Sequence, residues 1–323
     1  MNTDLFERLD DAGFGSNVRE VAAEADCRVL RLEDASGEGF MMMYRVFDGI
    51  YLMYNDFHLK SCVSEYQNAE TVLCIDHCRE GRIEHENSVG GRYYMEAGDL
   101  RIDRRVHHEG NVHLPLSHYH GLTIGFVRGD AQVSLKRELP SVQVDLDALS
   151  QKFCPDSKEF LLRANEPLNM IFTQLYRTPK SIRQDYFKLK ITELLLQLSA
   201  LDPSEFAEER QYFPAQQTDK IKEIHTLMTS DLGRNYTTDE LSRRFEIPSA
   251  SLRKIFKAVY GSPIYQYIRN YRMNAAASML MSEPDINIAE IAQKLGYDNA
   301  SKFSAAFRDV MGVSPQEYRK GER

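Results

Sequence analysis

The chain has no apolar run approaching the roughly 18 residues that a membrane-spanning helix requires. Its N-terminus carries acidic residues at once and lacks the apolar core of a secretion signal, so we expect a cytoplasmic protein without a membrane partner. Its five cysteines are an odd number without disulfide-framework spacing, and we expect them to be reduced thiols. These absences exclude a membrane protein and a disulfide-stapled secreted domain.

The composition is that of an ordinary globular protein. Hydrophobic residues make up 42% of the chain and charged residues 27%, which leaves enough apolar side chains for packed cores. At about 150 residues per domain, a chain of 323 residues is expected to hold two domains.

Charge is unevenly distributed along the chain. The net charge of −8 on its own argues against a nucleic-acid partner. Residues 216–323, however, contain 16 Lys and Arg against 13 Asp and Glu, so this part carries +3 and the preceding part −11. Such asymmetry favours contact with a polyanion in the second part, although a solvated surface explains +3 about equally well.

Within the first two hundred residues, the sequence pattern changes once, from strand-like to helical. From about residue 27 to 144, short runs rich in Val, Ile, Tyr and Phe alternate with turn residues, which predicts an antiparallel sandwich or small barrel. Helical spacing follows over residues 157–170 and 182–200, and residues 202–217 lack periodicity and are predicted to form a linker. The predicted fold class is α+β.

The last hundred residues contain an internal repeat offset by 50 to 51 positions. Each copy has the pattern of two helices joined by a short turn, which is the helix-turn-helix geometry. The apolar positions that repeat, and that we assign to the core, are Leu241, Phe245, Leu252, Phe256, Ile291, Leu295, Phe303 and Phe307.

Capping residues mark the expected helix boundaries in both copies. We predict N-caps at Thr238, Ser249, Asn287 and Asn299. The two copies are connected by a long helix that Ser262-Pro263 opens and that runs to Leu280.

The second copy, INIAEIAQKLGYDNASKFSAAFRDVMGVSPQEYR, resembles the C-terminal signature of the AraC/XylS family of transcription regulators. The resemblance covers residues 218–319 and implies two helix-turn-helix units on a rigid connecting helix, which place two recognition helices in successive major grooves. It also implies promoter DNA and RNA polymerase as partners, with activation of transcription as the commoner mode of regulation in the family. The matching positions are Ile291-Ala292, Gly296-Tyr297, Phe303, Phe307-Arg308, Gly312, Ser314-Pro315 and Tyr318-Arg319.

Polar residues on the outer faces of the repeat are the candidate DNA contacts. Arg253 is the expected base reader, because its planar fork can pair bidentately with guanine. Lys254, Lys257, Arg269 and Arg272 are expected to hold phosphates, with Ser249 and Ala250 at the helix start.

The second recognition helix is expected to contribute phosphate anchoring and contacts with thymine methyl groups. Ala305 stands where many AraC/XylS relatives have Arg or another long polar residue, which weakens direct base readout at this end. The candidate contacts here are Ala300, Ser301, Lys302, Ser304 and Arg308.

Eight of the nine histidines fall between residues 58 and 120. Period-2 spacing places His118 and His120 on one strand face, where with Tyr93 and Tyr94 they are candidates for binding an effector. A divalent metal is the alternative, held by His113, His118 and His120, although the carboxylate that cupin metal motifs place next is missing.

Two further interpretations of the histidines stay open at this point. Cys74, His77 and Cys78 form a softer candidate metal cluster. The histidines can also be purely structural. No cofactor is firmly predicted.

The sequence favours a one-component regulator over two alternatives. Residues 1–201 are predicted to be a cupin-like effector-sensing and dimerisation domain, and residues 218–323 an AraC-type DNA-binding domain. We expect no enzyme, because no catalytic motif is present. The alternatives are a cupin metalloenzyme fused to a DNA-binding domain and a ligand-independent regulator controlled by a protein partner.

A homodimer is expected to form through the helix over residues 182–200. The apolar stripe of this helix is wider than one sheet face usually needs, and packing on its own sheet is the alternative. The stripe consists of Ile191, Leu194, Leu195 and Leu198.

Overall fold

The computed structural model describes residues 14–86, 90–163, 165–206, 211–283 and 285–321. The chain divides into two compact units, the first from residues 1–85 and 93–211 and the second from residues 86–92 and 212–323. Within the described ranges, no helix combines the length and the apolar character needed to cross a membrane.

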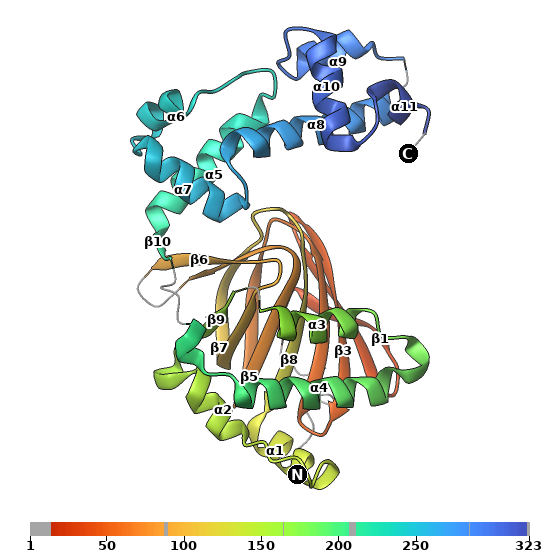
Figure 1. The fold of residues 1–323 in the computed structure, drawn as a ribbon, viewed down its shortest axis with the longest axis vertical. Helices are drawn as coiled ribbons and strands as arrows, with labels where there is room; N and C mark the ends of the chain where they lie inside the picture. Colours follow the sequence, from red (N-terminus) through yellow and green to blue (C-terminus); the bar gives the residue numbers. More distant parts are fainter. Residues whose placement is uncertain (1–13, 87–89, 164, 207–210, 284, 322–323) are drawn as a thin grey trace. The chain divides into compact units, whose positions relative to one another are not determined.

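The first unit is built on a curled, largely antiparallel sheet, as predicted (Figure 1). Its strands lie in the order β1-β2-β3-β4-β8-β5-β6, and β7 pairs with β5 and β9. The strands are β1 (Val18–Ala23), β2 (Cys27–Asp34), β3 (Gly37–Phe47), β4 (Ile50–His58), β5 (Ser61–Glu86), β6 (Gly91–Glu96), β7 (Leu100–His113), β8 (Tyr119–Val127) and β9 (Phe160–Leu162).

Four helices follow the main strands: α1 (Arg128–Glu138), α2 (Leu146–Phe153), α3 (Glu166–Tyr176) and α4 (Arg183–Ala200). The helix predicted over residues 182–200 is confirmed as α4. The helix predicted over residues 157–170 is wrong, because Phe160–Leu162 pairs with β7 as strand β9. Helix α3 begins only at Glu166, where the Asn165 side chain caps the Leu168 amide.

The main core lies between one face of the sheet and the helices. Alternation along β4 directs Ile50 and Leu52 to this face, where residues of β8 join them. Figure 1 shows α3 and α4 running across the same face. The predicted dimerisation stripe of α4 is also in this core, with Ile191, Leu194, Leu195 and Leu198 all buried. These four residues therefore pack on their own sheet, and their prediction as dimer contacts is wrong.

The second unit contains both predicted helix-turn-helix copies. Helices α6 and α7 form the first and α9 and α10 the second, while α8 runs between the two groups (Figure 1). The short strand β10 (Phe213–Pro214) pairs with residues 91–92. The helices are α5 (Ala215–Ser230), α6 (Thr238–Phe245), α7 (Ser249–Tyr260), α8 (Ile264–Ser282), α9 (Ile288–Lys294), α10 (Ala300–Met311) and α11 (Pro315–Arg319).

Seven of the eight predicted core positions in the repeat are fully buried, and Phe245 is only partly buried. Caps at Asn287 and Asn299 are confirmed, because their side chains accept hydrogen bonds from the amides of Ala289 and Lys302.

The two caps predicted for the first copy are wrong. Thr237, rather than Thr238, accepts from the Glu240 amide at the start of α6. Pro248 is the N-cap residue of α7, and the Ser249 hydroxyl donates to Asp239 Oδ1 at 3.0 Å instead.

Candidate DNA-binding interface

Helix α7 presents three exposed cations on one side and an apolar face on the other. Arg253, Lys254 and Lys257 are exposed, whereas Leu252 and Phe256 are buried. In the part of the chain that the structure describes, none of the three cations forms an ion pair. Ala250 is exposed and Ser249 half-buried at the start of the helix. The side chains predicted to contact DNA from α7 are therefore available to an anionic partner.

Helix α10 offers a less basic surface. Ser301, Lys302 and Arg308 are exposed, while Ala300 and Ser304 are half-buried. Lys302 Nζ lies 3.2 Å from Asp298 Oδ2, but both side chains are strongly exposed, and such surface pairs contribute little. The side chains at the start of α10, Ala300 and Ser301, are small.

Helix α8 holds both recognition helices. At its first half, the Tyr267 ring lies 5.6 Å from that of Phe256 on α7. At its second half, Met273 and Ala276 form a buried cluster with Phe303 and Phe307 of α10. Because α7 and α10 both pack on α8, this helix connects the orientation of one to that of the other.

Of the two arginines of α8 predicted to hold phosphates, Arg272 is buried and Arg269 is partly exposed. Arg269 Nη2 lies 2.6 Å from Asp309 Oδ2, whose side chain is 66% exposed, so this surface pair contributes little and the phosphate role of Arg269 stays a prediction. Arg272 is only 8% exposed and donates to Asn235 Oδ1 at 2.7 Å and to the Arg234 carbonyl at 2.9 Å. Its burial lowers the pKa of the guanidinium. Arg272 thus fixes the turn before α6, which its position in the sequence alone did not indicate.

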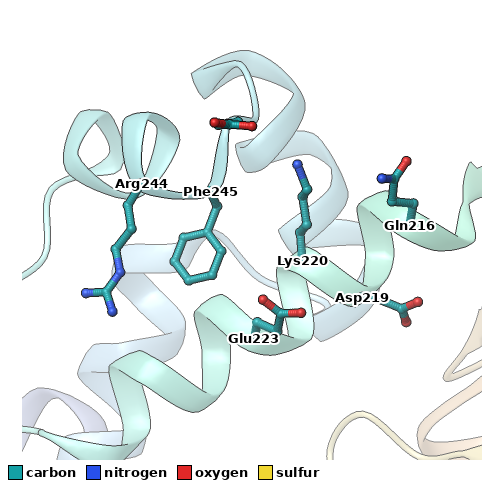
Figure 2. Close-up of a pocket in the computed structure, with 7 residues that line it drawn as sticks. Gln216, Asp219, Lys220, Glu223, Arg244 and Phe245 are labelled. Carbon is teal, nitrogen blue, oxygen red and sulfur yellow. The ribbon is translucent and has the colours of Figure 1, made fainter.

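A polar cavity of about 420 Å³ lies between α5 and the end of α6 (Figure 2). Charges of both signs line it, so it lacks the uniform potential of a phosphate site. Sequence analysis missed this cavity, because its walls come from separate segments. The lining residues are Gln216, Asp219, Lys220, Glu223, Arg244, Phe245 and Glu246.

In the first unit, His118 and His120 lie close together but contact different groups. Their rings are 6.3 Å apart. His118 precedes β8 and its Nδ1 is 3.2 Å from the Leu116 carbonyl, whereas His120 Nε2 is 2.8 Å from Asp56 Oδ1. The two imidazoles therefore do not share one strand, although the spacing predicted that they would.

Tyr93 and Tyr94, predicted to line the same effector site, are buried in the first unit. The Tyr94 hydroxyl donates to Glu84 Oε2 at 2.7 Å. The Tyr93 ring stacks on His85 with centroids 5.2 Å apart. The structure thus gives both tyrosines packing partners of their own.

Neither metal cluster predicted from the sequence is assembled. Among the described residues, the group of three possible ligands with donor atoms close enough is Asp56, His58 and His120, not His113, His118 and His120. Sequence analysis missed Asp56 because it belongs to β4, and strand register alone brings it opposite His120.

The alternative metal cluster predicted from the sequence is Cys74, His77 and Cys78, and these side chains have different surroundings. His77 stacks on Phe172 with ring centroids 4.3 Å apart, and its Nε2 lies 3.0 Å from Asn169 Oδ1. Burial lowers the pKa of His77 to about 4 and raises the pKa of Cys74 and Cys78 to about 12 each. All five cysteines are buried free thiols, and burial raises the pKa of Cys27, Cys62, Cys74 and Cys78, whereas a reactive thiolate has a lowered pKa.

A buried polar cluster occupies the sheet face opposite the main core, and sequence analysis did not identify it. Asp76 accepts a hydrogen bond from Thr123 Oγ1 at 2.7 Å and pairs with Arg105. Arg101 Nη2 lies 2.7 Å from Asp103 Oδ2. Such buried ion pairs cost desolvation energy, so they add little net stability.

Comparison with known proteins identifies the C-terminal part of the chain. Residues 241–321 match the family model of a helix-turn-helix domain. A transcriptional regulator of Bacillus subtilis, YtdP, is 35% identical over 31% of this chain, but the match covers 12% of that protein. An AraC-like transcription regulator of Streptomyces lividans is 33% identical over 29% of this chain and 31% of its own length. The chain thus spans less than a third of either relative.

A longer match reaches into the first unit. The Msm operon regulatory protein of Streptococcus mutans is 24% identical over 70% of this chain and 76% of its own length. These three relatives are regulators by name and not enzymes, in agreement with the prediction that the chain is not an enzyme.

Two solved structures give weaker similarity. The C-terminal domain of AraT from Geobacillus stearothermophilus is 27% identical over 32% of this chain and 84% of that chain, with a TM-score of 0.30. Fatty-acid-bound ToxT from Vibrio cholerae is 15% identical over 83% of this chain and 94% of that chain, with a TM-score of 0.33.

Proposed function

We propose that the protein is a cytoplasmic transcriptional regulator of the AraC type that binds double-stranded promoter DNA, because residues 241–321 match a helix-turn-helix family model and an AraC-like regulator is 33% identical over 29% of this chain. The observation that carries this proposal is the face of α7, where Arg253, Lys254 and Lys257 are exposed without ion pairs among the described residues. The opposite face of α7 is buried against its own domain. Recognition helices enter the major groove in this way, with their outward side chains toward the bases.

Salt dependence of DNA binding tests this proposal. Duplexes selected from a random library by the full chain are titrated at several salt concentrations. The slope of log K against log salt is expected to be about −0.9 per phosphate contact. Replacing Lys254 and Lys257 together by Gln removes two contacts and reduces the slope by about 2.

Lys294→Gln is the matched control, because Lys294 is exposed on α9 and already pairs with Glu290 at 3.0 Å. It is expected to leave the slope unchanged. DNA binding that does not respond to salt, or an unchanged slope in the double variant, contradicts the proposal.

The effector-sensing role of the first unit is a further part of the proposal. It is supported by the buried cluster around Asp76 and Arg105, because small-molecule sites contain a few precisely placed polar groups. Contacts of an effector with His118, His120, Tyr93 and Tyr94 stay a prediction. The proposed effector is therefore a small polar or charged compound.

Thermal-shift screening of the full chain against metabolites tests the effector site. A compound at a hundredfold excess over its dissociation constant stabilises the protein by about 2.7 kcal/mol. Thr123→Val is expected to abolish the shift if the compound binds at the cluster. Loss of the shift in His118→Ala instead assigns the site to the predicted histidines, and a panel without any shift favours the ligand-independent alternative.

We propose that the protein acts as a homodimer and as an activator together with RNA polymerase. The activator role is supported by the transcriptional activator RhaR of Mannheimia succiniciproducens, which is 26% identical over 31% of this chain. For the dimer, α4 carries a second apolar stripe in addition to its buried one. Leu189 and Leu196 are exposed and seven residues apart, so they share one side of the helix, and Ile182, the residue just before α4, is exposed as well.

A further inference from the structure

Three potential metal ligands meet where β4 ends and β8 begins. In the antiparallel pairing of these strands, Asp56 lies directly opposite His120. His58 is two residues after Asp56 on β4, so the pleat directs it to the same side of the sheet. The three side chains therefore share one face, although they come from distant parts of the sequence.

The distances within this group are short. Asp56 Oδ1 lies 2.8 Å from His58 Nε2 and 2.8 Å from His120 Nε2. The donor atoms of all three residues lie within 4.8 Å of one another. The imidazole rings of His58 and His120 are 5.4 Å apart and nearly perpendicular.

Hydrogen bonding does not account for this arrangement. Asp56 Oδ1 is a buried atom, and within the described residues no hydrogen bond with proper geometry reaches it. Each Nε2 donates a proton or binds a metal along a direction in the plane of its ring. This direction therefore does not point at Asp56 Oδ1. The carboxylate and the two imidazoles lack a group that satisfies all three.

We infer that Asp56, His58 and His120 bind one divalent transition-metal ion, with Zn²⁺ as the ion that fits this donor set. Two imidazole nitrogens and one carboxylate oxygen are typical ligands of Zn²⁺, whereas Ca²⁺ and Mg²⁺ prefer oxygen alone. Around a tetrahedral ion with bonds of about 2.0 to 2.1 Å, neighbouring donors lie roughly 3.3 Å apart. The two distances between the carboxylate and the imidazoles therefore need to open by only about half an ångström from the 2.8 Å observed.

Exposure gives the ion access to solvent. The His58 side chain is 61% exposed and that of His120 is 32% exposed. Three protein ligands leave a fourth position for water or an exchangeable ligand. The ion would join β4 to β8 beyond the main core, and this inference does not depend on the proposed DNA-binding function.

Calorimetric titration of the chelator-treated full chain with Zn²⁺ tests the inference. One Zn²⁺ per chain is expected to bind, and His58→Ala, His120→Ala and Asp56→Asn are each expected to weaken binding at least about tenfold. His118→Ala is the matched control, because it removes a neighbouring imidazole outside the group, and it is expected to change the affinity less than about twofold. Circular dichroism checks that each variant is folded.

Titration of the wild-type chain with Co²⁺ keeps the test decisive if a variant fails to fold. The expected result is a tetrahedral Co²⁺ absorption spectrum with paramagnetic shifts of the His58 and His120 ring signals. The inference is overturned by absence of stoichiometric binding, by unaltered affinity in His58→Ala, or by a loss in His118→Ala as large as in His58→Ala.

Discussion

At the scale of single residues, Arg253 and Arg272 show how one side-chain type serves two purposes in the same domain. Arg253 is exposed on α7 and has no ion-pair partner among the described residues, so its guanidinium can reach a base edge. Arg272 donates to Asn235 and to the Arg234 carbonyl from a buried position. If the guanidinium left these acceptors, both hydrogen bonds that hold the turn before α6 would be lost, so Arg272 serves the fold.

Arg253→Ala is expected to weaken binding to the preferred DNA sequence by about 1 to 3 kcal/mol and to relax preference at one base pair. The physical reason is the loss of a bidentate contact with guanine. Binding to all single-base variants of the selected duplex measures this effect. Arg137→Ala, which removes one exposed arginine from the first unit, is the control for net charge. If Arg253→Ala weakens all sequences equally, Arg253 contacts phosphate and does not read a base.

At the scale of elements, the attachment of α3 to the sheet involves a neutral histidine. His77 on β5 stacks on Phe172 and contacts Asn169, both from α3. Burial lowers the pKa of His77 to about 4, because the charged imidazolium would lose its hydration against the helix. Protonation must therefore weaken the contact between β5 and α3.

Acidification is expected to destabilise the first unit through His77. The unfolded chain binds a proton near pH 6.5 and the folded chain only near pH 4, so stability is full above about pH 6.5 and falls as the pH decreases between these values. Between about pH 7.5 and about pH 5 the loss from His77 is about 2 kcal/mol. Urea unfolding of the wild type and of His77→Gln at both pH values measures it. An equal pH dependence in the two proteins would falsify this role of His77.

At the scale of the whole molecule, α4 has two apolar stripes with different roles. The buried stripe, which includes Leu195, belongs to the main core of the first unit. The exposed stripe of Leu189 and Leu196, with Ile182 just before the helix, leaves apolar surface in water. Burying this surface between two copies of the chain is favourable, which is the physical basis of the proposed dimer.

Leu189→Glu is expected to yield a folded monomer, because Leu189 is 65% exposed and a carboxylate there is solvated in the single chain. The same carboxylate would be desolvated in a dimer contact. Sedimentation velocity of the wild type and the variant measures the change. Leu195→Glu is the matched comparison on the same helix and is expected to unfold the first unit. A monomeric wild type, or a dimer that survives Leu189→Glu, contradicts the proposal.

The sequence by itself determined the two helix-turn-helix units. Apolar positions at helical spacing and caps such as Asn287 and Asn299 act over a few residues, so their effect is readable along the chain. The same holds for α4, whose bounds were predicted closely, and for the β-rich character of the first unit. Where a short apolar run fits both a strand and a helix, as around Phe160–Leu162, local pattern failed because pairing with β7 decided the outcome.

Only the tertiary structure decided which side chains meet and which remain exposed. The sequence around Arg272 and around the buried stripe of α4 does not reveal which neighbours cover these side chains. Packing in the tertiary structure removes them from solvent. Asp56 and His120 lie 64 residues apart in the sequence and become neighbours through the register of β4 and β8. Strand register is fixed by the sum of many contacts across a sheet, so no local sequence pattern predicts which side chains the register brings together.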